Sequence, residues 1–181
     1  VSGGFLFSFG QFVPSWDSSY YPLMMTQNVA YKEYLMSKWW LVVAGTLISL
    51  PLASFYLFFS WETYLAILAG GIYNMGVNAH LVLLSGAYTR TPIDLNSMQG
   101  AFGDKKSFNI KTLLLSVPKI ILPMFIFYVG VLLHSKLVGF GIIAMVGVLG
   151  FALRNTVFKW IEQIYQNEKH LTLDAYKQRN A

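Results

Sequence analysis

The stretch WWLVVAGTLISLPLASFYLFFSW, residues 39–61, decides the fold class of this chain. It holds 23 consecutive residues without a single Asp, Glu, Lys or Arg. A helix rises about 1.5 Å per residue, so this one is roughly 35 Å long and can cross the roughly 30 Å hydrocarbon core of a bilayer. Trp39, Trp40 and Trp61 stand at its ends, where amphipathic rings favour the headgroup level. We therefore predict a transmembrane helix here.

Three further apolar runs follow this one, and a shorter one precedes it. The run at 1–13 is too short to cross a bilayer, and we expect it to be the end of a longer span. The sequence thus predicts an all-α, polytopic transmembrane bundle in a single domain, with four full spans and one truncated N-terminal span. The predicted segments are the end of a span (1–13), a cytoplasmic elbow of helices (14–38), spans at 39–61 and 63–88, a cytoplasmic loop (89–111), spans at 112–134 and 137–157, and a cytoplasmic tail (158–181).

The composition favours a lipid environment over water. Apolar residues make up 55% of the 181 residues and charged residues only 12%, and the mean hydropathy is +0.51. Soluble domains carry roughly 25% charged residues, so this chain has too little polar surface to be solvated on all sides. The chain also lacks Cys, which excludes disulfides and thiolate metal sites.

The basic residues gather on one side of the predicted spans. The connector between the last two spans holds Lys136 alone, whereas eleven of the 13 Lys and Arg lie in the elbow, in the 89–111 loop and near the C-terminus. Lys and Arg accumulate in cytoplasmic loops of multi-pass proteins, so we expect these segments and the C-terminus to face the cytoplasm. This bias also accounts for the net charge of +5 without a nucleic-acid partner.

The sequence lacks the short motifs of common catalytic and nucleotide sites. HExxH, GxxxxGK[ST] and GxGxxG are absent, and the three histidines are scattered along the chain. All eight acidic residues lie outside the predicted spans, which weighs against a proton relay. We therefore predict a protein that is not an enzyme, with no catalytic residue, no metal site and no cofactor.

Three polar side chains inside the predicted spans are candidates for interhelical bonding or for a transport pathway. Asn74 and Asn78 are four residues apart and share one helix face, and packing is their main interpretation, with pathway lining as the alternative. Lys119 lies roughly 9 Å from the cytoplasmic end of its span. We expect it to snorkel to the inner surface, with a pathway charge as the alternative. Pro118 and Pro123 flank it, and the carbonyls that these prolines free need other partners.

Small residues recur at every third position in the last predicted span. They are Gly141, Ala144, Gly147 and Gly150. Such a stripe lets another helix approach closely, so we predict that it is a packing surface.

The segment WDSSYYPLMMTQNVAYKEYLMSK, residues 16–38, predicts two short helices at the inner membrane surface. Asp17 and the serines that follow it, before Pro22, are typical of a helix start, and Asn28 is the expected cap of a second helix that runs into the next span. Aromatic and Met side chains are expected between lipid and cytoplasm. A plain membrane-surface helix and a docking surface for a soluble partner explain this pattern equally well.

The order of these elements resembles the permease subunits of type-2 ABC exporters, in which a cytoplasmic elbow with a Leu-rich helix and a Lys precedes the next span. More closely, the chain resembles an uncharacterised bacterial family of polytopic membrane proteins grouped with those permeases. The matching pieces are Trp16-Asp17-Ser18, Tyr34-Leu35-x-x-Lys38 and Arg90-Thr91-Pro92-Ile93-Asp94-Leu95-Asn96.

This resemblance implies a multi-pass permease subunit of the bacterial inner membrane that couples a separate ATPase subunit to export, and it allows a homodimer. The absence of a phosphate loop agrees with ATP hydrolysis on another chain. The alternatives are a scaffold or assembly subunit that docks a different cytoplasmic protein, and an intramembrane enzyme with its catalytic residues upstream. The implied coupling residues are Trp16, Asp17, Tyr31, Glu33, Lys38, Arg90 and Asp94.

Overall fold

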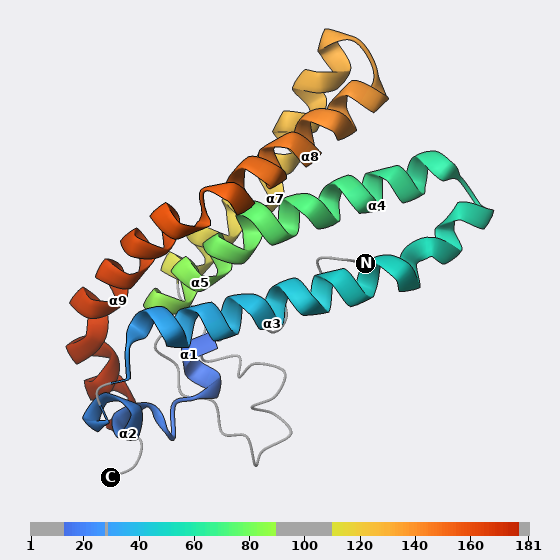
Figure 1. The fold of residues 1–181 in the computed structure, drawn as a ribbon. Helices are drawn as coiled ribbons and strands as arrows, with labels where there is room; N and C mark the ends of the chain where they lie inside the picture. The colour runs from blue at the N-terminus through green and yellow to red at the C-terminus, as the bar shows by residue number, and fades with distance from the viewer. Residues whose placement is uncertain (1–12, 28, 90–109, 178–181) are drawn as a thin grey trace.

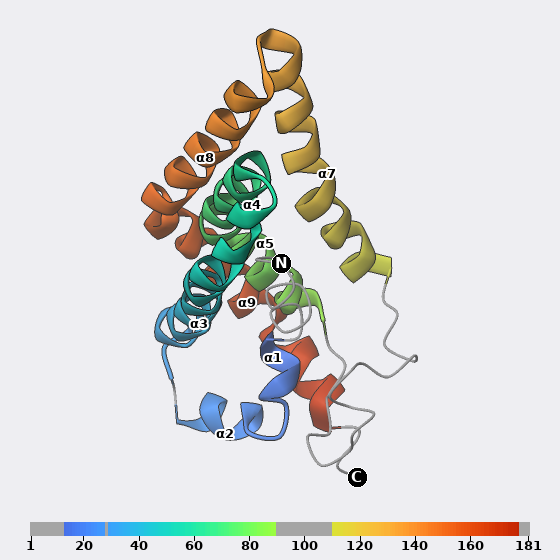
Figure 2. The same ribbon diagram turned by 90° about the vertical axis from the view of Figure 1, so that its right-hand side faces the viewer.

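The computed structural model describes residues 13–27, 29–89 and 110–177, and every regular element in these ranges is helical, which confirms the all-α class. In chain order the elements are α1 (Val13–Trp16), α2 (Tyr21–Thr26), α3 (Tyr31–Leu52), η2 (Ala53–Phe58), α4 (Trp61–Tyr73), η3 (Asn74–Asn78), α5 (Ala79–Tyr88), α7 (Ile110–Leu133), α8 (Lys136–Ala152) and α9 (Arg154–Lys177). Two long hairpins, α3–α4 and α7–α8, form most of an elongated bundle, and α9 runs back toward α1 and α2 (Figures 1 and 2).

The first hairpin turns sharply between two apolar helices. Its first arm changes from α-helix to the 3-10 helix η2 just after Pro51, and Ser60 then caps α4 by accepting a hydrogen bond from the Thr63 backbone N–H at 3.4 Å. The second arm runs through α4, η3 and α5 with a single π-helical turn at η3. Both arms are long and apolar enough to cross a membrane.

The second hairpin ends in a sharp bend that the sequence analysis missed. Ser135 caps α8 by accepting a hydrogen bond from the Val138 N–H, and α8 ends at Ala152. The next helix, α9, begins at Arg154 and is bent by 65° from α8. The segment predicted as one span at 137–157 therefore contains a bend, because the chain leaves the direction of the hairpin at residue 153.

The two helices predicted for the elbow correspond to α2 and to α3, which runs into the next span, whereas the short helix α1 was not predicted. The caps also differ from those expected. Tyr20 is the N-cap of α2 and Ala30 is the N-cap of α3, and neither caps with its side chain. Asp17 does not cap α2, because its carboxylate is used in contacts with α3 that are described below. Asn28, the predicted cap, lies outside the described residues.

Glycines bring α8 against the middle of the first hairpin. A Cβ added at Gly147 would lie 2.7 Å from the backbone of Ile72, and one at Gly150 would lie 2.6 Å from the Gly76 carbonyl oxygen. A Cβ at Gly76 would in turn collide with the Gly147 carbonyl. The predicted small-residue packing surface is thus confirmed at Gly147 and Gly150, whereas a Cβ at Gly141 would meet nothing within 4 Å.

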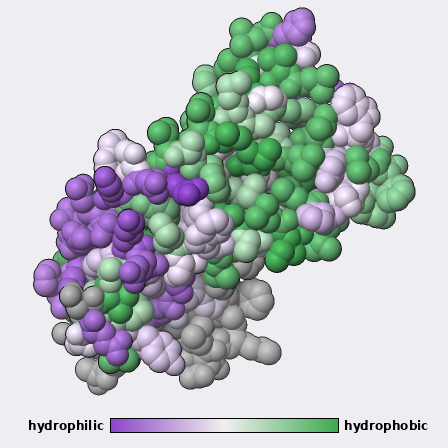
Figure 3. Space-filling model, in the orientation of Figure 1, coloured by the Kyte–Doolittle hydropathy of each residue, from purple (hydrophilic) through white to green (hydrophobic). Residues whose placement is uncertain are grey.

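Much of the bundle surface is apolar, as in a membrane protein (Figure 3). Three segments are long and apolar enough to cross a membrane, Tyr31–Phe58, Trp61–Tyr88 and Ser116–Leu133, and a fourth is reached if the bent pair α8–α9 counts as one span. Only 22% of the first apolar window and 11% of the third are buried inside the protein. Their outward-facing Phe, Leu, Ile and Met side chains therefore need lipid around them.

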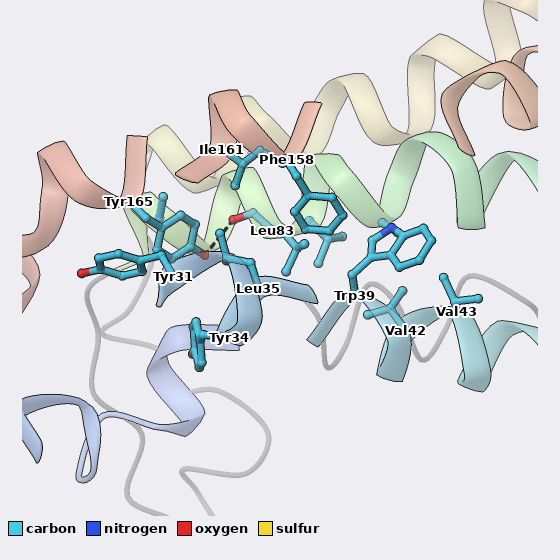
Figure 4. Packing of buried hydrophobic residues seen from close by; sticks show 13 residues of the cluster. Tyr31, Tyr34, Leu35, Trp39, Val42, Val43, Leu83, Phe158, Ile161 and Tyr165 are labelled. Carbon is cyan, nitrogen blue, oxygen red and sulfur yellow. Dashed lines mark hydrogen bonds between the residues drawn. The ribbon is translucent and has the colours of Figure 1, made fainter. Parts of the chain in front are cut away.

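The main apolar core lies where α3, α5 and α9 meet (Figure 4). Leu35, Trp39 and Val42 of α3 and Leu83 of α5 are at most 1% exposed, and Phe158 of α9 packs against Trp39 with ring centroids 5.9 Å apart. This core lies beside the elbow and fixes α9 against the first hairpin.

Candidate functional site

Asp17 ties the elbow to α3. Its Oδ2 accepts a hydrogen bond from the Tyr34 hydroxyl at 2.8 Å and lies 2.7 Å from Lys38 Nζ. Tyr34 and Lys38 are one helical turn apart, so both side chains reach the same carboxylate. About a quarter of each charged side chain is exposed, which leaves the ion pair less screened than a surface pair. We call Asp17, Tyr34 and Lys38 the elbow clamp, and it joins two of the segments singled out in the sequence.

A second set of contacts ties the elbow to α9. The Tyr21 and Tyr31 hydroxyls are 3.0 Å apart, and the Tyr31 hydroxyl donates to Met25 Sδ at 3.1 Å. The Tyr31 ring lies 6.0 Å from that of Tyr165, and Tyr21 meets Tyr176 edge to face at 5.5 Å. Burial, reinforced by the contact with the Tyr31 hydroxyl, raises the pKa of Tyr21 well above its usual value. These hydroxyls therefore act as neutral hydrogen-bonding groups.

Helix α9, which contacts the elbow, also contacts the first hairpin. The Tyr165 hydroxyl donates to the Leu83 carbonyl of α5 at 2.9 Å. The elbow consequently touches α3 directly through the clamp and reaches α5 through Tyr165.

The seven implied coupling residues fall into three groups. The expected exposure of the elbow aromatics is wrong for Tyr31, which is 8% exposed and packed within the chain, whereas Glu33 on the first turn of α3 is exposed. Trp16 is half-buried at the end of α1, and it directly precedes Asp17, which pairs with Lys38 in the clamp. Arg90 and Asp94 lie outside the described residues.

A pocket of about 360 Å³ opens between the elbow and α9. Its walls come from α2, the α2–α3 connection, the start of α3 and one face of α9. Its lining residues are Met25, Val29, Ala30, Tyr31, Glu162, Gln166 and Lys169. We call it the elbow pocket. It combines apolar side chains with one acid, one amide and one base, so it offers both apolar surface and charge.

The predicted amide pair lies at the contact between η3 and α7. Asn78 Nδ2 donates to Asn74 Oδ1 at 2.8 Å and to the Lys119 carbonyl at 3.2 Å. Pro123 lies four residues after Lys119 and has no N–H, so the helix leaves this carbonyl without its usual donor. Asn78 supplies the missing bond, which confirms that a proline-freed carbonyl recruits another partner.

The Lys119 side chain points into the protein. Only 1% of the residue is exposed, and Nζ donates to Ser85 Oγ at 2.8 Å, so the expected snorkelling to the membrane surface is wrong. Ser85 Oγ donates in turn to the Val82 carbonyl at 2.8 Å, and Thr89 Oγ1 donates to the Ser85 carbonyl at 3.0 Å. We call Asn74, Asn78, Lys119, Ser85 and Thr89 the buried polar chain. It links η3, α5 and α7.

Sequence reasoning missed Ser85 and the tyrosines Tyr21 and Tyr165. Ser85 is seven residues after Asn78, a spacing that keeps it on the same helix face, so a signal was present. It was not informative by itself, because Ser hydroxyls in spans commonly bond to their own helix. The tyrosines carried no signal, since their partners are far away in the sequence.

Some buried polar atoms have no hydrogen-bond partner among the described residues, namely Trp39 Nε1, Tyr73 OH, Asn78 Oδ1 and His80 Nε2. His80 Nδ1 lies 2.7 Å from the Gly76 carbonyl and donates to it, which leaves Nε2 as the free ring nitrogen. Within the described ranges, no three His, Cys, Asp or Glu side chains are grouped so that they could hold a metal ion.

A family model matches residues 1–179, nearly the whole chain, and the protein therefore belongs to a family of unknown function, DUF5687. No curated protein and no solved structure matches the chain.

Proposed function

We propose that this DUF5687 protein is the membrane-embedded permease subunit of an ABC-type exporter, which couples a separate ATPase subunit to substrate movement. In this proposal four spans cross the bacterial inner membrane, and the elbow, α9 and the C-terminus lie in the cytoplasm. The observation that carries the proposal is the elbow clamp, because it fastens a short helical element directly to the start of an apolar span.

In this proposal the elbow transmits a movement of the ATPase to the helices that it contacts. Asp17 holds Tyr34 and Lys38 on α3, while Tyr21 and Tyr31 pack against tyrosines of α9. A rigid displacement of α2 would therefore act on α3 and α9 together. Since Tyr165 bonds to the Leu83 carbonyl, α5 follows as well.

The distribution of charge supports the proposed orientation. The turns at Ser60 and Ser135 come together at one end of the molecule, where Lys136 Nζ lies 3.8 Å from the Glu62 carboxylate. The opposite end carries the elbow and α9, and Figure 3 shows hydrophilic side chains gathered there. A positively charged end facing the cytoplasm agrees with the usual bias of basic residues.

The elbow pocket is the proposed contact with the ATPase. Glu33 lies exposed on the first turn of α3, and Glu162 and Lys169 line the pocket itself. An exposed carboxylate beside a mixed polar and apolar pocket offers both a charge and a surface to a cytoplasmic subunit.

A scaffold or assembly subunit is the second candidate. The observation that favours it is the hydrogen bonding of Asn78, whose amide donates to Asn74 and to the α7 backbone. Amides used in this way pack helices together and do not line a route for substrate.

Charge reversal at the elbow tests the permease proposal. A tagged full-length protein with Glu33→Lys should retain less ATPase when solubilised, and its membranes should show lower ATP turnover than wild-type membranes. Glu62→Lys is the matched control, because it makes the same exchange at an exposed site on the other end of the molecule. The permease proposal fails if the wild-type protein retains no ATPase, or if the two variants behave alike.

A further inference from the structure

A shallow apolar groove runs along the contact between α8 and the first hairpin. It has a volume of about 270 Å³ and is lined by Ile72, Met75, Gly147, Val148, Phe151 and Ala152. The walls come from α4, η3 and α8, and Gly147 is one of the positions where the two backbones touch. We call it the α8 groove.

The groove faces outward from the bundle. Val148 is 58% exposed, and Ala152 is exposed at the end of α8. Sites that enclose a whole drug-sized ligand have volumes of roughly 300–1,000 Å³, so this groove holds part of a longer molecule. In a bilayer the molecules beside such a surface are lipids, and a single hydrocarbon chain has the required shape and chemistry.

A positive charge lies at one end of the groove. The Arg154 guanidinium lies 5.0 Å from the ring centroid of Phe151, which is itself a wall of the groove, and 5.9 Å from the ring of Trp39. The guanidinium therefore makes cation–π contacts with both rings, and the Arg154 side chain is partly exposed. Among the described residues Arg154 has no ion pair with an acid.

The bend between α8 and α9 places this charge at the edge of the apolar surface. The apolar helix α8 ends at Ala152, two residues before Arg154, and the charged helix α9 leaves it at 65°. A lipid beside α8 would therefore have its acyl chain along the groove and its phosphate at the level of Arg154. Guanidinium groups bind phosphate oxygens with two parallel hydrogen bonds.

We propose that the α8 groove and Arg154 form a binding site for an anionic phospholipid of the cytoplasmic leaflet. One acyl chain occupies the groove, and the headgroup phosphate binds Arg154. The proposal is independent of the ATPase, but it rests on the orientation in the proposed function, which places Arg154 on the cytoplasmic side of the membrane. It gives the α8–α9 bend a role, because a bound lipid would bridge the two helices on either side of residue 153.

Lipid titrations of the detergent-purified full-length protein test this site. Native mass spectrometry would compare dioleoyl phosphatidylglycerol with dioleoyl phosphatidylcholine. We expect wild type to bind the anionic lipid more tightly, and Arg154→Gln to lower that affinity about fivefold, as expected for one cation at a membrane surface. The zwitterionic lipid should be nearly unaffected by this change.

Three further variants separate the two parts of the site. Lys159→Gln removes the same charge from an exposed position of the same helix and should leave binding unchanged. Arg154→Lys should keep the preference for the anionic lipid, and Ala152→Phe, which fills the groove, should weaken both lipids. The proposal is overturned if Lys159→Gln weakens binding as much as Arg154→Gln, which would indicate diffuse attraction, or if Ala152→Phe leaves both lipids unaffected.

Discussion

Helices at the elbow end of the molecule are joined by directional side-chain contacts, whereas the crossing of α8 with the first hairpin is made by backbone against backbone. Asp17, Tyr34 and Lys38 meet through a hydrogen bond and an ion pair at the elbow, and Gly76, together with the glycines of α8, lets carbonyl groups approach at the crossing. Polar side-chain contacts such as those of the clamp can break and re-form when the helices shift. At the glycine crossing, backbone packs directly against backbone, so the helices have little room to shift. The α8 crossing is therefore the more rigid part of the molecule, and the elbow end is the more adjustable part.

The largest effect is expected at the crossing. Gly76→Ala would place a methyl group against the Gly147 carbonyl, and overpacking of this kind should lower stability by roughly 3 kcal/mol, since backbone cannot move aside. Thermal unfolding in detergent measures the loss. Gly141→Ala is the control, because a Cβ there meets nothing within 4 Å, and it should not lower the unfolding temperature. Equal unfolding temperatures for the two variants would show that the crossing is not tight.

The next effect concerns the buried polar chain between the two regions. Asn78→Leu leaves the Lys119 carbonyl without a donor and should lower stability by roughly 1–2 kcal/mol. Pro123→Ala restores the helical N–H four residues after Lys119, so the same substitution should be less damaging in that background. The free energies of unfolding of the two single variants and of the double variant give the coupling free energy between Asn78 and Pro123. Purely additive changes would mean that Asn78 does not compensate for the proline.

A smaller and more local effect is expected at the elbow clamp. Asp17→Asn weakens the pair with Lys38 and should lower the stability of the elbow by about 1 kcal/mol, because the pair is only partly buried. Hydrogen exchange should increase in α2 and in the first turns of α3 and leave α8 unchanged. Glu62→Gln is the control. It removes the charge from the exposed pair of Glu62 and Lys136, whose charged atoms lie 3.8 Å apart, and it should alter hydrogen exchange little. Faster exchange throughout the bundle would contradict the division into two regions.

The smallest effect at neutral pH concerns Tyr21. Burial raises the pKa of this hydroxyl above its value of about 10 in an unfolded chain. The neutral hydroxyl therefore stabilises the folded elbow at neutral pH, and this contribution is lost as the pH rises above about 10. Tyr21→Phe removes the titrating group, so the unfolding temperature should fall less steeply between pH 9 and pH 11, roughly the range around the unfolded value. Identical slopes for the two proteins would show that Tyr21 is not buried in this way.

Features that depend on one helix alone could be predicted from the sequence. The apolar runs give the long helices because length and lack of charge decide whether a helix can span a bilayer. The hydrogen bond between Asn74 and Asn78 follows from a spacing of four residues, and the bonding of the Lys119 carbonyl follows from Pro123.

Features that depend on contacts between distant segments could not be predicted. Asp17 has the composition of a helix start, but Lys38 and Tyr34 use its carboxylate instead. The bend at residue 153 has no proline to mark it. It forms because α9 buries Phe158, Ile161 and Tyr165 against α3 and α5, which draws the helix away from the axis of α8.

The proposed function requires that the elbow and α9 face the cytoplasm and that the turns at Ser60 and Ser135 lie on the other side of the membrane. The chain has no Cys, so a single Cys can be placed at Lys136, which is exposed at the hairpin end, or at Lys159, which is exposed on α9. A membrane-impermeant maleimide should label Lys136→Cys on intact cells and should label Lys159→Cys only after the cells are opened. Labelling of Lys159→Cys on intact cells would contradict the orientation, and with it the proposed coupling to a cytoplasmic ATPase.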